Sequence, residues 1–154
     1  ARFGRERGFE IRYIEFMPLD AQQLWDRSRV LLADEILAML ESGIWPLVAI
    51  RAADPRAPAT EYRFRDGIGS VGFIASVSRP FCLNCNRLRL TADGKLRYCL
   101  FALEETDVKA LLRAGDPAAV ERTIREVVRG KWLGHEINST RFVAPPRPMY
   151  SIGG

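Results

Sequence analysis

The chain has 154 residues, of which 47% are hydrophobic and 27% charged, a balance typical of a folded domain and not of a disordered segment. Its apolar runs are short, and none approaches the roughly 20 residues that a membrane-spanning helix needs. The formal net charge is +4, and only three of the 23 basic residues are lysines, so nearly all of the positive charge is guanidinium, which suits bidentate contacts with anions.

The first residues, Ala1-Arg2-Phe3-Gly4, contain neither an initiator methionine nor an apolar signal region. We therefore expect the sequence to be part of a longer protein that is not exported. The three cysteines are an odd number, which argues against a disulfide framework and favours metal ligation in a reducing compartment, the cytoplasm.

Residues 10–17 alternate polar and apolar side chains and precede a proline, a pattern that predicts a strand ended by a turn. We expect Ile11 and Tyr13 to pack in a core, and Arg12 and Glu15 to point elsewhere.

The next segments predict a helix followed by strands. Residues 32–41 have the apolar spacing of an amphipathic helix, with a glycine stop at Gly43. Residues 47–52, 61–65 and 70–76 are expected to form strands, the first two flanking a proline-rich loop.

Residues 87–91 and 95–100 predict a hairpin around Asp93-Gly94, because Asp-Gly is a strong turn signal. The pattern then becomes helical over residues 106–113 and 117–129, with Asp116 as the N-cap. By composition, the proline-, arginine- and glycine-rich C-terminus is expected to be frayed.

All three cysteines lie in one stretch of the chain. Cys82-Leu83-Asn84-Cys85 presents two thiolates to one metal, and Cys99 follows after thirteen residues, a separation that a hairpin can close. Structural zinc needs four ligands, and a Cys3His site would require His135, thirty-six residues beyond Cys99. An iron-sulfur cluster held by three thiolates would leave one iron open to another ligand. Structural zinc, an iron-sulfur cluster and plain buried thiols all remain open on this evidence.

The same stretch is strongly basic. From residue 79 to residue 97, five cations stand against one carboxylate, an excess of +4 that equals the net charge of the whole chain. Strand alternation places Arg87 and Arg89 on one face and Leu88 on the other. Such a pair suits a phosphate, although basic strand faces are often merely solvated.

Residues 73–101, which contain the three cysteines and both arginines, resemble the molybdenum cofactor biosynthesis protein A family closely and without gaps. Residues 11–17 and 152–154 are also similar to that family, so the resemblance runs almost from end to end. It implies an α/β fold: the C-terminal part of an incomplete triosephosphate-isomerase-like barrel, with residues 1–20 as the last barrel strand and its preceding segment. Residues 21–154 would be an extension of antiparallel strands and helices that binds a cluster and GTP.

The resemblance also implies the site residues. Cys82, Cys85 and Cys99 would ligate a 4Fe-4S cluster whose open iron meets the guanine edge. The residues expected to contact GTP are Arg87, Leu88, Arg89 and Arg12. Met17 would contact S-adenosylmethionine, and Gly153-Gly154 would extend into the active site, where the lack of side chains permits a close approach.

By the same resemblance, the intact enzyme is a homodimeric radical S-adenosylmethionine enzyme that converts GTP to 3′,8-cyclo-GTP and passes its product to the next enzyme of molybdopterin synthesis. The chain has no CxxxCxxC motif, so we expect it to be inactive alone. The alternative is a zinc module that contacts nucleic acid through a basic hairpin, which is disfavoured because a second cysteine pair is missing.

Overall fold

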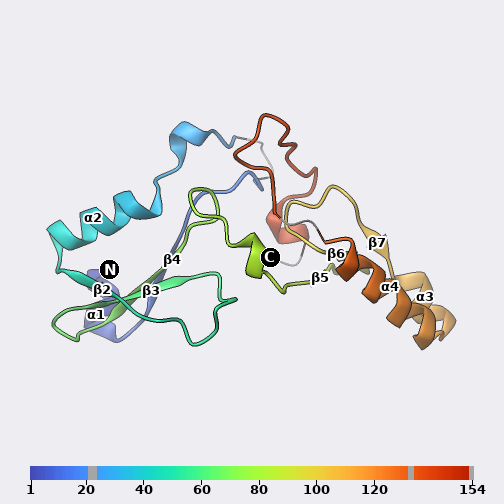
Figure 1. The fold of residues 1–154 in the computed structure, drawn as a ribbon, viewed down its shortest axis with the longest axis horizontal. Helices are drawn as coiled ribbons and strands as arrows, with labels where there is room; N and C mark the ends of the chain where they lie inside the picture. Colours follow the sequence, from blue (N-terminus) through green and yellow to red (C-terminus); the bar gives the residue numbers. More distant parts are fainter. Residues whose placement is uncertain (21–23, 132–133, 153–154) are drawn as a thin grey trace. The chain divides into compact units, whose positions relative to one another are not determined.

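The computed structural model describes residues 1–20, 24–131 and 134–152 (Figure 1). The chain divides into two compact units. Unit 1 comprises Ala1–Met17 and Asp26–Cys85, and unit 2 comprises Pro18–Trp25 and Asn86–Gly154. Each unit contains both helices and strands, which confirms the mixed α/β class. The barrel and the boundary near residue 20 stay predictions.

Unit 1 is built on a four-stranded mixed sheet with the order β1-β4-β3-β2. Its strands are β1 (Ile11–Ile14), β2 (Leu47–Ala49), β3 (Thr60–Phe64) and β4 (Ser70–Ile74). β1 runs parallel to β4, and the other neighbours are antiparallel. The helical segments of the unit are α1 (Arg2–Arg7), η1 (Arg27–Arg29), α2 (Ala33–Gly43) and η2 (Cys82–Asn84). All four predicted strands are therefore present; β1, β2 and β4 are shorter than predicted, and β3 has the predicted length but begins one residue earlier.

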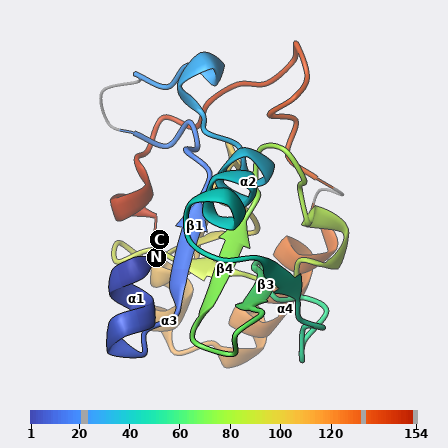
Figure 2. The same ribbon diagram turned by 90° about the vertical axis from the view of Figure 1, so that its left-hand side faces the viewer.

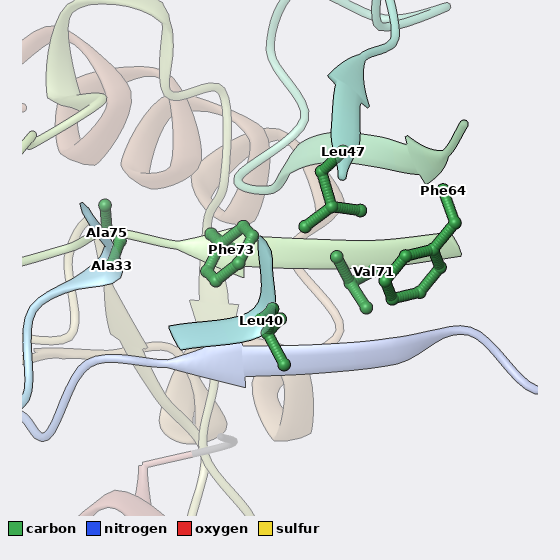
Figure 3. Close-up of a cluster of buried hydrophobic side chains, with 7 residues drawn as sticks. All are labelled: Ala33, Leu40, Leu47, Phe64, Val71, Phe73 and Ala75. Carbon is green, nitrogen blue, oxygen red and sulfur yellow. The ribbon is translucent and has the colours of Figure 1, made fainter. Parts of the chain in front are cut away.

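Helix α2 lies across one face of this sheet (Figure 2). It begins where the Glu35 carboxylate accepts a hydrogen bond from the Leu32 amide at 2.7 Å, and it ends at Gly43 as predicted. The core between helix and sheet is a cluster of buried apolar side chains (Figure 3): Ala33, Leu40, Leu47, Phe64, Val71, Phe73 and Ala75. Burial of this apolar surface is the main force that holds α2 on the strands.

Glu15 was expected to point away from the core, and this expectation is wrong. Its side chain is only 3% exposed. The carboxylate accepts hydrogen bonds from the backbone amides of Ala33 (2.9 Å), Val77 (2.8 Å) and Ser78 (2.8 Å), and from the Ser78 hydroxyl. Strand β1 ends at Ile14, so the alternation of side chains no longer governs position 15.

These hydrogen bonds explain how a buried carboxylate remains charged. Burial alone raises the pKa of Glu15, but the hydrogen bonds from Ser78, Ala33 and Val77 outweigh it and hold the pKa below the ordinary value. Glu15 thus ties the end of β1 to the start of α2 and to the segment that follows β4.

We expect Glu15→Gln to destabilise the fold by about 1–3 kcal/mol, because the amide places a donor where backbone N–H groups need an acceptor. The measurement is the free energy of unfolding in urea. Glu6→Gln, which changes an exposed carboxylate of α1, is the control and should stay within about 0.5 kcal/mol of the parent. Equal stability of the two variants would contradict the role given to Glu15.

Unit 2 contains a three-stranded antiparallel sheet with the order β5-β6-β7. Its elements are β5 (Arg89–Leu90), β6 (Lys95–Arg97), β7 (Thr106–Asp107), α3 (Lys109–Ala114), α4 (Pro117–Arg129) and η3 (Met149–Ser151). The predicted hairpin is confirmed by the pairs Arg89 with Arg97 and Leu90 with Leu96.

The two helices of unit 2 pack side by side and α4 also contacts β6 (Figure 1). The predicted N-cap is confirmed, since the Asp116 side chain accepts a hydrogen bond from the Ala119 amide at 2.9 Å. The predicted helical start at Thr106 is wrong, because Thr106 pairs with Leu96 as part of β7. The edge of β6 that β5 leaves open was available for pairing, and pairing with it outweighed the local helical pattern.

Candidate metal and nucleotide site

Cys82 and Cys85 lie in unit 1 at the ends of one tight turn. η2 covers Cys82–Asn84, and the Cys85 amide donates a hydrogen bond to the Cys82 carbonyl at 3.0 Å. Positions three apart lie on the same side of such a turn, so the backbone brings the two cysteine residues to one side of it. Both are half-buried and neither is in a disulfide, whereas the intervening Leu83 is 83% exposed. This arrangement suits two ligands of one metal centre.

The segment before Cys82 is held at two places within unit 1. Glu15 fixes Val77 and Ser78, as described above, and the Arg79 guanidinium lies 3.1 Å from the Asp34 carboxylate of α2. The backbone that leads into the turn with Cys82 and Cys85 is therefore restrained within unit 1.

Cys99 lies in unit 2, two residues after β6. Its Sγ accepts a hydrogen bond from the Phe101 amide at 3.5 Å. The loop is shaped by the Arg97 guanidinium, which donates to the carbonyls of Leu100 (3.2 Å) and Ala102.

Arg87, Leu88 and Arg89 also lie in unit 2, and their exposure alternates as predicted. Both arginines are half-buried, while Leu88 and Leu90 are exposed. Only Arg89 belongs to β5, and Arg87 is held next to it by its carbonyl, which accepts a hydrogen bond from Lys131 Nζ at 2.8 Å. Arg87 and Arg89 are thus the half-buried residues on either side of the exposed Leu88, and their pairing on a phosphate stays a prediction.

The local excess of positive charge is smaller than the sequence indicates. Three of the five cations in that stretch pair with carboxylates: Arg79 with Asp34, Lys95 with Asp107, and Arg97 with Glu105. Arg97 is moreover only 1% exposed, so it serves the interior of unit 2 and no external ligand. The acidic partners lie outside the basic stretch, which is why counting charges within it overestimated the field.

Arg12 lies on β1 in unit 1 and is half exposed. Its Nε is 2.5 Å from a Glu10 carboxylate oxygen and its Nη2 is 3.6 Å from Glu61. The hydrogen bond that Arg12 donates to the Glu10 carboxylate is the largest cause of a raised pKa of Arg12, so the side chain stays charged. Gly72, opposite Arg12 on β4, leaves room for the arginine stem, since a Cβ there would lie 3.3 Å from Arg12 Cγ.

Met17 is half-buried in unit 1. Its predicted contact with S-adenosylmethionine stays a prediction. The predicted residues Gly153 and Gly154 lie outside the described residues.

The predicted site residues that the structure describes are divided between the units. Unit 1 contains Cys82, Cys85, Arg12 and Met17, and unit 2 contains Cys99, Arg87, Leu88 and Arg89. Within the described part of each unit taken alone, no three His, Cys, Asp or Glu side chains converge on one metal position. The ligand set of three cysteines stays a prediction.

Two groups near these residues were not expected from the sequence. Glu15 supports the segment before Cys82, and Glu105 in unit 2 accepts hydrogen bonds from the guanidiniums of Arg97 and Arg147. Neither belongs to a motif, and no local pattern distinguishes them from solvated carboxylates. Among the described residues, no helix has the length and apolar composition needed to cross a membrane.

Comparison with known proteins confirms the family resemblance. Residues 9–137 match the model of the family described as Molybdenum Cofactor Synthesis C, and the chain belongs to this family. It is 47% identical to the GTP 3′,8-cyclase of Mycobacterium sp. (strain KMS) over 99% of the chain and 44% of that relative. It is also 45% identical to the GTP 3′,8-cyclase of Mycolicibacterium smegmatis and 46% identical to GTP 3′,8-cyclase 2 of Mycobacterium tuberculosis, again over 99% of the chain and 44% of each relative. The chain thus spans less than half the length of the curated relatives that it matches.

Proposed function

We propose that this chain acts as the C-terminal, GTP- and cluster-binding part of a GTP 3′,8-cyclase in molybdenum cofactor biosynthesis. The observation that carries the proposal is the match of 99% of the chain, at 45–47% identity, to relatives of that name. The chemistry of the residues supports it, since half-buried cysteines outside disulfides lie close in sequence to two half-buried arginines, Arg87 and Arg89.

Cys82, Cys85 and Cys99 would hold a 4Fe-4S cluster. The donor set fits: two thiols flank one turn, and the third already accepts a backbone hydrogen bond at its sulfur. When bound, the cluster supplies an iron with an open position for the guanine edge of the substrate.

The remaining residues would bind and orient GTP. Arg87 and Arg89 offer two guanidiniums to phosphate oxygens, and the exposed Leu88 between them offers an apolar contact. Arg12, held in its charged form, would reach the same nucleotide. In this scheme S-adenosylmethionine meets the chain through Met17, and Gly153-Gly154 approaches the reacting nucleotide.

The wider setting is part of the same proposal. The intact enzyme would be a homodimer in the cytoplasm, where a reducing environment preserves thiolate ligands. Its product, 3′,8-cyclo-GTP, would pass to the next enzyme of molybdopterin synthesis. A zinc module for nucleic acid is less well supported, because three of the five cations of the basic stretch are paired with carboxylates.

The test is anaerobic reconstitution followed by iron and sulfide analysis. A 4Fe-4S cluster requires about four iron and four sulfide per chain, together with visible absorption that GTP perturbs. A colourless protein that takes up zinc in preference to iron would contradict the proposal.

We further expect that the reconstituted chain does not cleave S-adenosylmethionine, because its sequence has no CxxxCxxC motif. The assay is dithionite reduction followed by a search for 5′-deoxyadenosine. Reproducible formation of that product above a cluster-free control would show that the three cysteines support cleavage of S-adenosylmethionine and would contradict this expectation.

A further inference from the structure

Arg147, near the C-terminus of unit 2, lies between two carboxylates that are distant in sequence. Its Nη1 is 3.1 and 3.0 Å from the two oxygens of Glu105. Both Nη atoms also reach Asp93, at 3.3 and 3.2 Å. Nη2 in addition donates to the Ser151 carbonyl at 2.8 Å. One guanidinium thus connects the hairpin turn, the segment after Cys99 and the C-terminal residues.

These contacts are more than an isolated ion pair in solvent. The side chains of Arg147 and Glu105 are 27% and 20% exposed, and Glu105 also accepts a hydrogen bond at 2.5 Å from Arg97, which is 1% exposed. Exposed single ion pairs contribute little to the stability of the fold, whereas an arginine that contacts two carboxylates within a network is held in one geometry. The Asp93 side chain is 50% exposed, and hydrogen bonds from Thr91 and Arg147 lower its pKa to about 2.

Strand β5 is the weakly held part of the hairpin that Arg147 contacts, because it is an edge strand of the described sheet, whereas β6 also pairs with β7 and contacts α4. β5 and β6 pair at only two positions, Arg89 with Arg97 and Leu90 with Leu96. A strand pair of this length is marginal by itself in water. Asp93 lies in the turn that joins the two strands, so a group fixed on Asp93 restrains the hairpin and with it Arg89.

The C-terminal segment that carries Arg147 is itself anchored in unit 2. Ile152 is 0% exposed, and the Met149 amide donates to the Leu19 carbonyl at 3.0 Å. Residues 147–152 therefore provide a fixed base from which Arg147 can hold the turn.

We propose that Arg147 is a positioning residue for the substrate-binding hairpin: through Asp93 and Glu105 it fixes the β5–β6 turn, so that Arg89 keeps the orientation in which it binds GTP. The inference rests on the proposed function, because it assigns a support to one of the residues that function requires. It also gives a structural role to the C-terminal segment, which its composition had predicted to be frayed.

The experiment compares Arg147→Gln with Arg141→Gln in the cluster-loaded chain. Arg141 lies in the same part of the sequence, is 78% exposed and forms an ion pair with Glu136, so it controls for the loss of one guanidinium. We expect Arg147→Gln to weaken GTP binding roughly three- to tenfold and Arg141→Gln to leave it unchanged. Iron content and the overall unfolding midpoint should match in the two variants. Arg147→Lys, which can pair with one carboxylate but cannot fork between two, should give an intermediate affinity.

Hydrogen exchange separates this inference from the function on which it rests. Arg147→Gln should accelerate exchange in β5, β6 and residues 149–152, with or without GTP. Unchanged exchange, or a loss of affinity shared by Arg141→Gln, would overturn the role of Arg147. A parent chain that binds no GTP would instead overturn the proposed function.

The double variant Asp93→Asn with Arg147→Gln should bind GTP no more weakly than Arg147→Gln alone, since both changes act through one contact. Additive losses of GTP affinity would count against the mechanism.

Discussion

Replacement of any one cysteine by serine, in Cys82→Ser, Cys85→Ser or Cys99→Ser, is expected to abolish cluster retention. Three thiolates are the fewest that can hold a cubane with one open iron, so no spare ligand is available. The iron content after anaerobic reconstitution should fall from about four to below about one per chain. The loss should be similar for all three variants, because each removes one corner of the cluster.

Leu83→Ala is the matched control for this series. Leu83 lies between Cys82 and Cys85, and its side chain is 83% exposed, so its removal changes the same turn without removing a ligand. It should retain the full iron content. A serine variant that also retained it would remove that cysteine from the ligand set, and Cys99 is the most informative, since it alone lies in unit 2.

Arg87→Lys and Arg89→Lys are each expected to weaken GTP binding about ten- to a hundredfold. A charge-assisted hydrogen bond contributes about 1.5–3 kcal/mol, and lysine keeps the charge but loses the planar fork that grips two oxygens. The measurement is the GTP dissociation constant of the cluster-loaded chain at fixed ionic strength. Cluster content should be unaffected, so that binding of substrate and binding of iron are separated.

Arg122→Lys provides the control, because Arg122 is an exposed arginine on α4 of the same unit. Its affinity for GTP should equal that of the parent. If the Arg87 and Arg89 variants also bound GTP as tightly as the parent, the pair would be a solvated basic face. Recognition would then depend on the open iron and on Arg12.

The sequence by itself determined the local elements where one short-range rule sufficed. Apolar spacing and a glycine stop predicted α2, the Asp-Gly pair predicted the turn between β5 and β6, and Asp116 predicted the start of α4. It also determined the candidate cysteines and arginines, because metal ligands and anion-binding groups are identified by residue type and spacing. Family membership followed from the same stretch.

The tertiary structure decided which charges are used inside the fold. Glu15 was predicted to lie outside but is buried, and its carboxylate accepts hydrogen bonds from four donors in two separate segments, at Ala33 and at Val77-Ser78. Arg97 was counted in a basic surface but pairs with Glu105 in the interior of unit 2. Arg147 reaches Asp93 across 54 positions of the chain. A buried or forked charge depends on partners that folding brings from far along the chain, and the strength of those contacts depends on exclusion of water, so neither can be read from neighbouring residues.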